Sequence, residues 1–335
     1  SIEALAAQVR QAWNDVSKLE FEPTAEIHHV VVAGMGGSAL GADVAKYVFK
    51  DVLTAPLDVV NSYHLPAYTN EHTLVILSSY SGSTEEVLSC AQEAKAKRAQ
   101  IMAIAAGSKL AELAKAENYP IYIINPEFNP SNQPRMAIGY AITGLLGMLA
   151  KAGVCSLTQA QIDEVITTII HTNEACNIAI PQDQNQAKLL AFTALDRRPI
   201  LVASDFLTGA VHTAANQFNE NAKAFADYKV VPELNHHLME GLRFPNSNST
   251  THLFVLIQSH LYDKAIQKRM QLTQQVIEQN HIETIEVTLL AESKLTQVFE
   301  LITILAYATF YLSMLENIDP SPIPFVDWFK DELSK

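Results

Sequence analysis

The sequence is poor in cysteine, poor in basic residues and free of very long apolar runs. Its three cysteines are an odd number without CxxC spacing, which argues against a disulfide framework or a zinc site and favours reduced thiols in the cytoplasm. Only 23 basic residues face 36 acidic ones, and the net charge of −13 argues against nucleic acid or an anionic membrane as a partner. The most apolar stretches, Met136–Ala150 and Leu301–Leu315, are shorter than the roughly 20 residues of a spanning helix. We therefore expect both to be buried helices.

The length and the pattern of apolar segments predict two α/β domains. We divide the 335 residues at position 152, into an N-terminal domain of residues 1–152 and a C-terminal domain of residues 153–335. Short apolar runs alternate with helix-forming segments in both halves, which predicts a doubly wound, flavodoxin-like parallel sheet in each. The expected strands are His29–Ala33, Leu57–Val60, Thr73–Leu77, Ile101–Ala105, Ile121–Ile124, Ile200–Ala203, Leu253–Gln258 and Ile285–Leu289.

Two loops rich in glycine and serine each follow an expected strand and open an expected helix. The first, Gly34–Gly41, reads GMGGSALG, and its glycines let the backbone turn sharply and approach a ligand closely. The second, Ser78–Thr84, reads SSYSGST, and a helix cap explains one of its five hydroxyl residues. The free N–H groups of a helix N-terminus suit a phosphate. Together the two loops predict a phosphate-binding site, although a capped helix alone would explain either loop taken singly.

The first loop also fits a dinucleotide-binding fingerprint. Gly34, Gly36 and Ala39 satisfy GxGxx(G/A), which is a weak signal by itself. A dinucleotide site expects an acidic residue for the ribose at the end of the next strand, but that strand ends at Asn61 and carries Asp58 at its start. The fingerprint is therefore incomplete, and a nicotinamide-dependent oxidoreductase stays an alternative.

Taken with two later segments, the loops resemble a known family. GMGGS followed by SYSGST resembles the sugar isomerase (SIS) domain, and NENAK at Asn219–Lys223 with PELNHH at Pro232–His237 resembles the bifunctional phosphoglucose/phosphomannose isomerases, which contain two SIS domains. This resemblance implies aldose–ketose isomerisation of glucose 6-phosphate, fructose 6-phosphate and mannose 6-phosphate without a metal or redox cofactor. It also assigns the substrate phosphate to Gly37, Ser38, Ser79, Ser81 and Thr84.

The resemblance assigns the chemistry to four further residues. Glu220 matches the base that moves a proton between C1 and C2, and Arg135 matches an arginine at the reacting end of the sugar. His236 matches a ring-opening histidine that reaches the site from the neighbouring subunit, which implies a homodimer. Lys330 matches a lysine at the ring oxygen. On their own, Glu220 reads as a solvated helix residue, His236 as a surface histidine and Lys330 as part of a solvated tail.

These residue types suit the reaction. A carboxylate can move a proton on one face of a cis-enediol, a guanidinium can stabilise the developing negative charge, and a histidine can exchange protons near neutral pH. The sequence departs from the family at Pro322-Ile323-Pro324, where other members can carry a hydroxyl residue linked to the mannose epimer. The resemblance therefore implies phosphoglucose activity more strongly than phosphomannose activity. A non-catalytic sugar-phosphate sensor is the other alternative, since SIS domains also occur in regulators.

Overall fold

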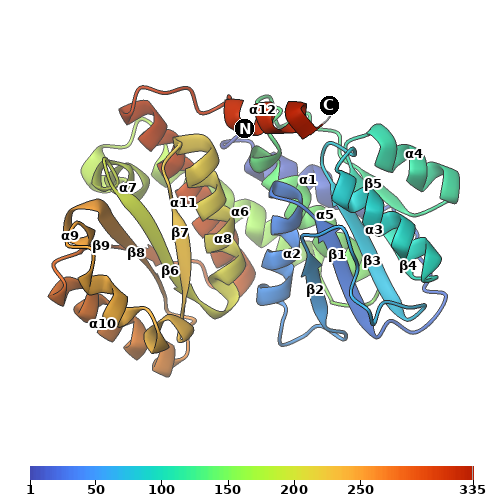
Figure 1. The fold of residues 1–335 in the computed structure, drawn as a ribbon, viewed down its shortest axis with the longest axis horizontal. Helices are drawn as coiled ribbons and strands as arrows, with labels where there is room; N and C mark the ends of the chain where they lie inside the picture. Colours follow the sequence, from blue (N-terminus) through green and yellow to red (C-terminus); the bar gives the residue numbers. More distant parts are fainter. Residues whose placement is uncertain (334) are drawn as a thin grey trace.

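The strands of the computed structural model, which describes residues 1–333 and 335, form two parallel sheets (Figure 1). The first has the strand order β2-β1-β3-β4-β5, made of β1 (His29–Gly34), β2 (Leu57–Val60), β3 (Thr73–Ser79), β4 (Gln100–Ala105) and β5 (Ile121–Ile123). The second has the order β7-β6-β8-β9, made of β6 (Arg198–Ser204), β7 (Asp227–Val231), β8 (His252–Ser259) and β9 (Glu283–Leu289). The predicted pair of doubly wound parallel sheets is confirmed, and the sheets lie on either side of position 152 in the sequence.

Helices cover both faces of each sheet, because alternate residues of a buried strand point to opposite faces. On β1, Val30 and Val32 face α1 (Leu5–Val16), α2 (Gly37–Val48) and α5 (Ile138–Lys151). Val31 and Ala33 face α3 (Glu85–Ala96) and α4 (Ser108–Glu117) on the outer side. On the second sheet, α10 (Lys264–Gln279) covers the outer face, and α7 (Gln186–Thr193), α8 (Thr208–Gln217) and α11 (Lys294–Leu315) cover the inner one. The described residues also form the helices α6 (Gln159–Cys176), α9 (Asn248–Thr251) and α12 (Pro324–Leu333).

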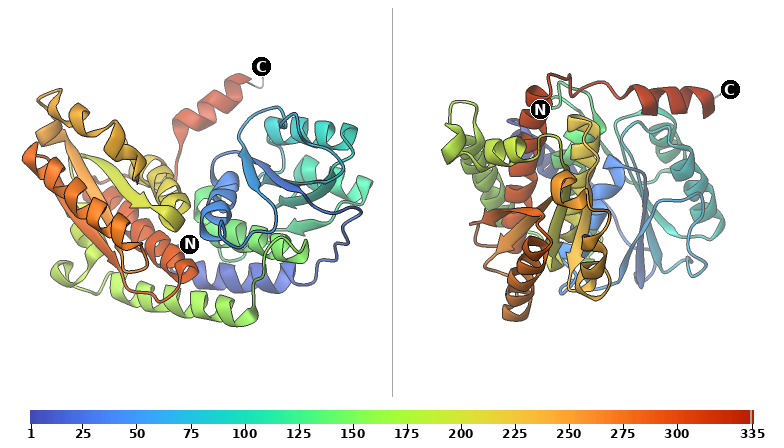
Figure 2. Two further views of the ribbon diagram at one scale, coloured as in Figure 1. Left: turned by 90° about the horizontal axis from the view of Figure 1, so that it is seen from below. Right: turned by 60° about the vertical axis from the view of Figure 1, so that its left-hand side comes forward.

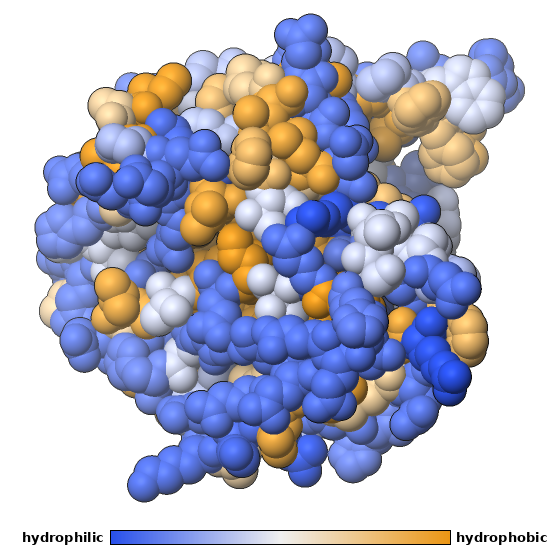
Figure 3. All heavy atoms as spheres, turned by 90° about the vertical axis from the view of Figure 1, so that its left-hand side faces the viewer, coloured by the Kyte–Doolittle hydropathy of each residue, from blue (hydrophilic) through white to orange (hydrophobic). Residues whose placement is uncertain are grey.

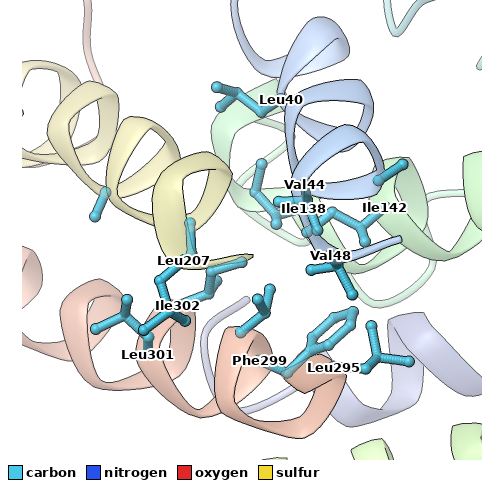
Figure 4. Packing of buried hydrophobic residues seen from close by; sticks show 14 of the residues in the cluster. Leu40, Val44, Val48, Ile138, Ile142, Leu207, Leu295, Phe299, Leu301 and Ile302 are labelled. Atoms are coloured by element: carbon cyan, nitrogen blue, oxygen red, sulfur yellow. The ribbon is translucent and has the colours of Figure 1, made fainter. Parts of the chain in front are cut away.

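The inner helices of both halves share one hydrophobic core. Figure 4 shows side chains of α2 and α5, such as Val44 and Ile142, pointing toward Leu207 and toward Phe299 of α11. By length and composition α11 could cross a membrane, but its most apolar stretch is 83% buried inside the protein, against α6, α7 and α8. The two expected apolar helices are therefore core helices, which begin at Ile138 and Lys294.

The sequence over Val211–Ala226 favours one continuous helix, but the structure breaks this segment. Helix α8 ends at Gln217, and a π-helical turn follows over Phe218–Ala222. Lys223 then adopts a left-handed conformation with φ of 54°, which stops the helix. The strand β7 comes next and was missed, because its sequence DYKVV has two charged residues in its first three. The short turn that carries Glu220 is a consequence of this break.

Helix α2 lies in close contact with a helix of each half. A Cβ added at Gly41 would lie 2.8 Å from the carbonyl oxygen of Ala141 in α5, and one at Gly209 would lie 2.5 Å from the amide nitrogen of Val44. Real Cβ atoms do not approach backbone so closely, so α8 can meet α2 only because position 209 is glycine. His212 of α8 adds a contact of 2.7 Å from its Nδ1 to Oδ2 of Asp43.

We expect Gly209→Ala to destabilise the protein, because the added methyl group would collide with backbone atoms of α2 that cannot rotate away. The loss of free energy of unfolding should be about 1–3 kcal/mol, as for an overpacked core. Gly241→Ala is the matched control, since nothing lies within 4 Å of the Cβ position there. Thermal unfolding of both variants measures the difference. Equal melting temperatures would contradict the close contact.

Candidate functional site

The two phosphate-loop candidates leave the carboxyl ends of adjacent strands. β1 pairs with β3 in parallel, and the strand order reverses there, which is where open α/β sheets bind ligands. The hydroxyl of Ser78 donates to the carbonyl of Ser38 at 2.8 Å, and the amide of Tyr80 donates to Oγ of Ser38 at 2.9 Å. The structure therefore joins the loops of Ser38 and Ser81 into one polar surface.

The second loop is stiffened by its own hydroxyl groups. Oγ of Ser79 lies 2.8 Å from Oγ1 of Thr84 and accepts the amide of Gly82 at 3.0 Å, while Oγ of Ser81 accepts the amide of Ser83 at 3.3 Å. Gly82 has φ of 70°, and a Cβ there would lie 1.9 Å from the carbonyl oxygen of Gly107. Thus the tight turn that presents these hydroxyl groups requires glycine.

The two helix N-termini differ in charge. The first turn of α2 has no acidic residue, whereas α3 carries Glu85 and Glu86 in its first turn. The carboxylates already complement the dipole of α3, so the N-terminus of α2 is the better place for an anion. The α3 loop then contributes mainly hydroxyl groups.

The backbone around Arg135 connects the loops to the second half of the chain. A Cβ at Gly37 would meet the backbone of Pro134 and Arg135 at 3.3–3.4 Å, so the first loop packs directly on this segment. On the other side, Nε2 of Gln217, at the end of α8, donates to the carbonyl of Arg135 at 3.1 Å. The antiparallel course of α2 and α8 places the loop of Ser38 and the turn of Glu220 at the same end of the molecule.

The guanidinium of Arg135 is buried and its five N–H groups all have protein acceptors. Nε donates to Oδ1 of Asn221 at 2.6 Å, and NH1 donates to Oε1 of Gln133 at 2.7 Å and to Oε2 of Glu220 at 3.4 Å. NH2 donates to the carbonyls of Pro320 and Ser321, both at 2.8 Å. A guanidinium has five such hydrogens, so none is left over in this state. The Glu220 bond is the longest of the five.

Glu220 is half-buried and sits on the π-helical turn. Burial raises the pKa of its carboxyl above the ordinary value, and the positive charges of Arg135, Lys223 and Lys330 oppose that rise. Burial also lowers the pKa of Arg135, while the Glu220 carboxylate opposes that shift. The pair thus holds a carboxylate whose basicity is increased beside a cation that keeps it ionised.

Lys330 and His236 lie in very different places. Lys330 is exposed on α12, a helix with no buried residue, but its charge reaches the Glu220 carboxyl. His236 is exposed at the end of the turn Glu233–His236, beyond the five-residue strand β7, which separates it from Glu220 by about 15 Å of extended chain. The structure therefore pairs Arg135 with Glu220 and leaves Lys330 within electrostatic range of that carboxyl, whereas no described contact joins His236 of the same chain to either residue.

Sequence reasoning missed three residues that surround Arg135. Gln133 and Asn221 position its guanidinium, and Lys223 contacts the same chain segment near Pro320 as Arg135 does. All three stand within two or three positions of predicted residues, in the segments QPR and NENAK. That proximity was the available signal.

The dinucleotide alternative finds no support in these contacts. Asn61, at the position where a ribose-binding carboxylate is expected, donates from Nδ2 to the carbonyl of Gly34 at 2.7 Å. Its amide closes the end of β1 and offers no carboxylate to a ribose.

Comparisons with known proteins match two separate stretches of the chain to family models. Residues 25–152 match the family model of the SIS domain, and residues 183–333 match the bacterial phospho-glucose isomerase C-terminal SIS domain. A bifunctional phosphoglucose/phosphomannose isomerase of Caldicellulosiruptor bescii is 32% identical over all of this chain and 98% of its own length. Another, of Thermoplasma acidophilum, is 28% identical over 93% of this chain and 91% of its own length. Among solved structures, a hypothetical protein from Thermus thermophilus has the same fold, with a TM-score of 0.76 at 17% identity, over 99% of this chain and 89% of its own.

We expect Gly82→Ala to weaken anion binding strongly, because the methyl group would strike the Gly107 carbonyl oxygen and displace the loop. The affinity for inorganic phosphate, followed by phosphorus NMR, should fall by about 5- to 150-fold, given an overpacking cost of about 1–3 kcal/mol. Gly153→Ala is the control, because Gly153 also has positive φ (72°) and no atom within 4 Å of its Cβ position, and it lies outside both loops. A loss no greater than in this control would contradict the role of the turn.

Proposed function

The chain belongs to the bifunctional phosphoglucose/phosphomannose isomerase family, and on that premise we propose that it interconverts glucose 6-phosphate and mannose 6-phosphate with fructose 6-phosphate. It is a sugar-phosphate isomerase with two SIS-type domains. The observation that carries the proposal is the pairing of Glu220 with buried Arg135, directly behind the loop of Ser38. Two phosphate-loop candidates and a basic carboxylate thus meet at one end of the molecule.

In this proposal the loops hold the phosphate and Glu220 transfers the proton. With the phosphate at the N-terminus of α2, the hydroxyl groups of Ser79, Ser81 and Thr84 complete its hydrogen bonds. After the ring opens, the Glu220 carboxylate takes a proton from C2 or C1 and returns it to the other carbon on the same face. Burial favours this step, since it raises the pKa of the carboxyl toward neutral pH.

Arg135 contributes chiefly through its charge. Its N–H groups are occupied by protein acceptors, so it stabilises a developing enediolate as a fixed positive charge beside Glu220, and through NH1, whose bond to Glu220 is long. Lys330 of α12 adds a second cation on the open side of the site, where it can meet the ring oxygen. A sensor that only binds sugar phosphate would need the loops, but it would gain nothing from a buried carboxylate with a raised pKa.

The ring-opening histidine is proposed to come from a second copy of the chain. His236 is exposed, lies far from Glu220 of its own chain, and has no hydrogen-bond partner among the described contacts. A homodimer that presents it to the neighbouring site would complete the set of four residues. We place this dimer in the cytoplasm, in keeping with three unpaired, buried cysteines whose thiol pKa values burial raises.

Glu220→Gln should lower kcat for fructose 6-phosphate by about 10²–10⁴-fold with little change in KM, because the amide cannot accept the proton while the phosphate loops are untouched. Glu117→Gln, at an exposed ion pair with Lys95, is the control. In the wild type, kcat/KM should fall as pH decreases through the raised pKa of Glu220, above the ~4.3 of an ordinary glutamate. Near-normal turnover in Glu220→Gln, with glucose and mannose 6-phosphates assayed side by side, would refute the mechanism.

Mixing two inactive proteins tests the shared site. His236→Ala and Glu220→Gln subunits should regain activity after subunit exchange, because one of the two sites in a mixed dimer then contains both native residues. Light scattering establishes the dimer, and differently tagged subunits establish the exchange. No recovery after proven exchange would show that the histidine serves another role.

A further inference from the structure

The chain between α11 and α12 is held by two cations. Lys223 donates to the carbonyl of Glu220, to that of Pro320 at 3.2 Å and to that of Pro322 at 2.6 Å. Arg135 donates to the carbonyls of Pro320 and Ser321. An ammonium has three hydrogens, so Lys223 directs all of them to backbone oxygens. The carbonyl of Pro320 accepts from both side chains.

Polar contacts rather than packing hold this segment. Between residues 319 and 333 only Pro320 and Ile323 are even partly buried, and α12 has no buried residue. A cavity of about 310 Å³ lies against the segment, lined by Pro320 and Ser321 together with Arg135 and Asn221. The hydrogen bonds from the two cations therefore determine where α12 begins.

Helix α12 has no packing partner of its own in the described part of the chain. Its large apolar side chains are exposed, Phe325, Val326, Trp328, Phe329 and Leu333. Both views in Figure 2 show it standing away from the sheets, and Figure 3 shows it protruding from the rest of the surface. Its position, and with it that of Lys330, depends on the segment that precedes it.

Lys223 is placed at an electrostatic cost that ending the helical turn would not by itself require. Lys223 stands near Arg135, and both desolvation and that neighbouring charge lower its pKa. Lys223 also follows the Glu220 turn directly, in a left-handed conformation that favours glycine. A lysine kept at such a position, with two of its three bonds made to residues about 100 positions away, indicates a task beyond ending the turn.

We propose that Lys223 is a positioning residue that clasps the segment from Pro320 to Pro322 and thereby sets where α12, and with it Lys330, stands relative to Glu220. The inference rests on the proposed function for the role of Lys330, and on the contacts alone for the clasp. Lys223 connects the turn that carries Glu220 to the segment that precedes α12, the helix that carries Lys330.

The kinetic test is a double-substitution cycle with Lys223→Met and Lys330→Met. Lys223→Met should lower kcat for fructose 6-phosphate by about 10- to 100-fold with little change in KM, since a misplacement of about 1 Å can cost about 100-fold. If Lys223 acts through Lys330, adding Lys223→Met to Lys330→Met should cost less than about twofold more. Effects that multiply in full would overturn the proposal and indicate that Lys223 acts on Glu220 alone.

The second measurement does not depend on activity. Trp13 and Trp328 are the two tryptophans of the chain, so in Trp13→Phe all tryptophan emission comes from Trp328 of α12. In this background, Lys223→Met should lower the fluorescence anisotropy of Trp328, and Lys229→Met, which removes a lysine paired with Asp227, should not. Unchanged anisotropy in Lys223→Met would overturn the clasp. If Lys223→Met does not fold, Lys223→Gly, which suits the φ of 54°, takes its place in both tests.

The two proposals fail in different ways. A wild-type protein that isomerises none of the three sugar phosphates would contradict the proposed function, while the anisotropy would still decide whether the clasp exists. If the wild type is active and Lys223→Met keeps both full activity and the wild-type anisotropy of Trp328, only the clasp is contradicted.

Discussion

The contact between α2 and α8 at Gly209 sets the geometry on which the site depends. Helix α2 begins at the loop of Ser38, and α8 ends at the turn of Glu220, so their spacing fixes the distance from that loop to the Glu220 carboxylate. Backbone meets backbone at this contact, and the shared core of Figure 4 surrounds it. A spacing set in this way cannot adjust by rotating side chains. Any opening of the site must therefore come from parts outside the paired helices, and the exposed α12 is such a part.

Arg135 links the fixed and the exposed parts of the site. Its backbone supports the first loop at Gly37 and accepts a bond from Gln217, while its guanidinium holds Glu220 and the root of α12. A buried arginine with an unpaired N–H would be unfavourable, and here each N–H has an acceptor. This explains why a cation placed at the start of a helix, where the dipole disfavours it, is nevertheless stable. Removing any one acceptor would leave part of a buried charge uncompensated.

The regular part of the fold could be predicted from the sequence, because buried parallel strands such as His29–Gly34 are short apolar runs that the flanking helices must cover. The break after Gln217 could not, because NENAK continues a helical pattern and the left-handed Lys223 has no local signal such as glycine. The site residues followed from motifs, but their connections did not. Lys223 bonds to Pro320 and Pro322 across about 100 residues, and such contacts arise only when both halves have folded together. That the tail forms the helix α12 was likewise not evident, because more than half of its residues are Phe, Val, Trp or Asp, which have only moderate helix propensity.

The charges around Glu220 also explain how an acidic protein can bind an anion. The chain has a net charge of −13, which repels a sugar phosphate at a distance, so attraction must be local. Three cations, Arg135, Lys223 and Lys330, act on the Glu220 carboxylate, and the carboxylates of Asp327 and Asp319 partly offset the charges of Arg135 and Lys223. Burying all three would be costly, because each like charge raises the cost of the next. Only Arg135 is buried; Lys223 lies at the surface with backbone oxygens as acceptors, and Lys330 remains in solvent on α12.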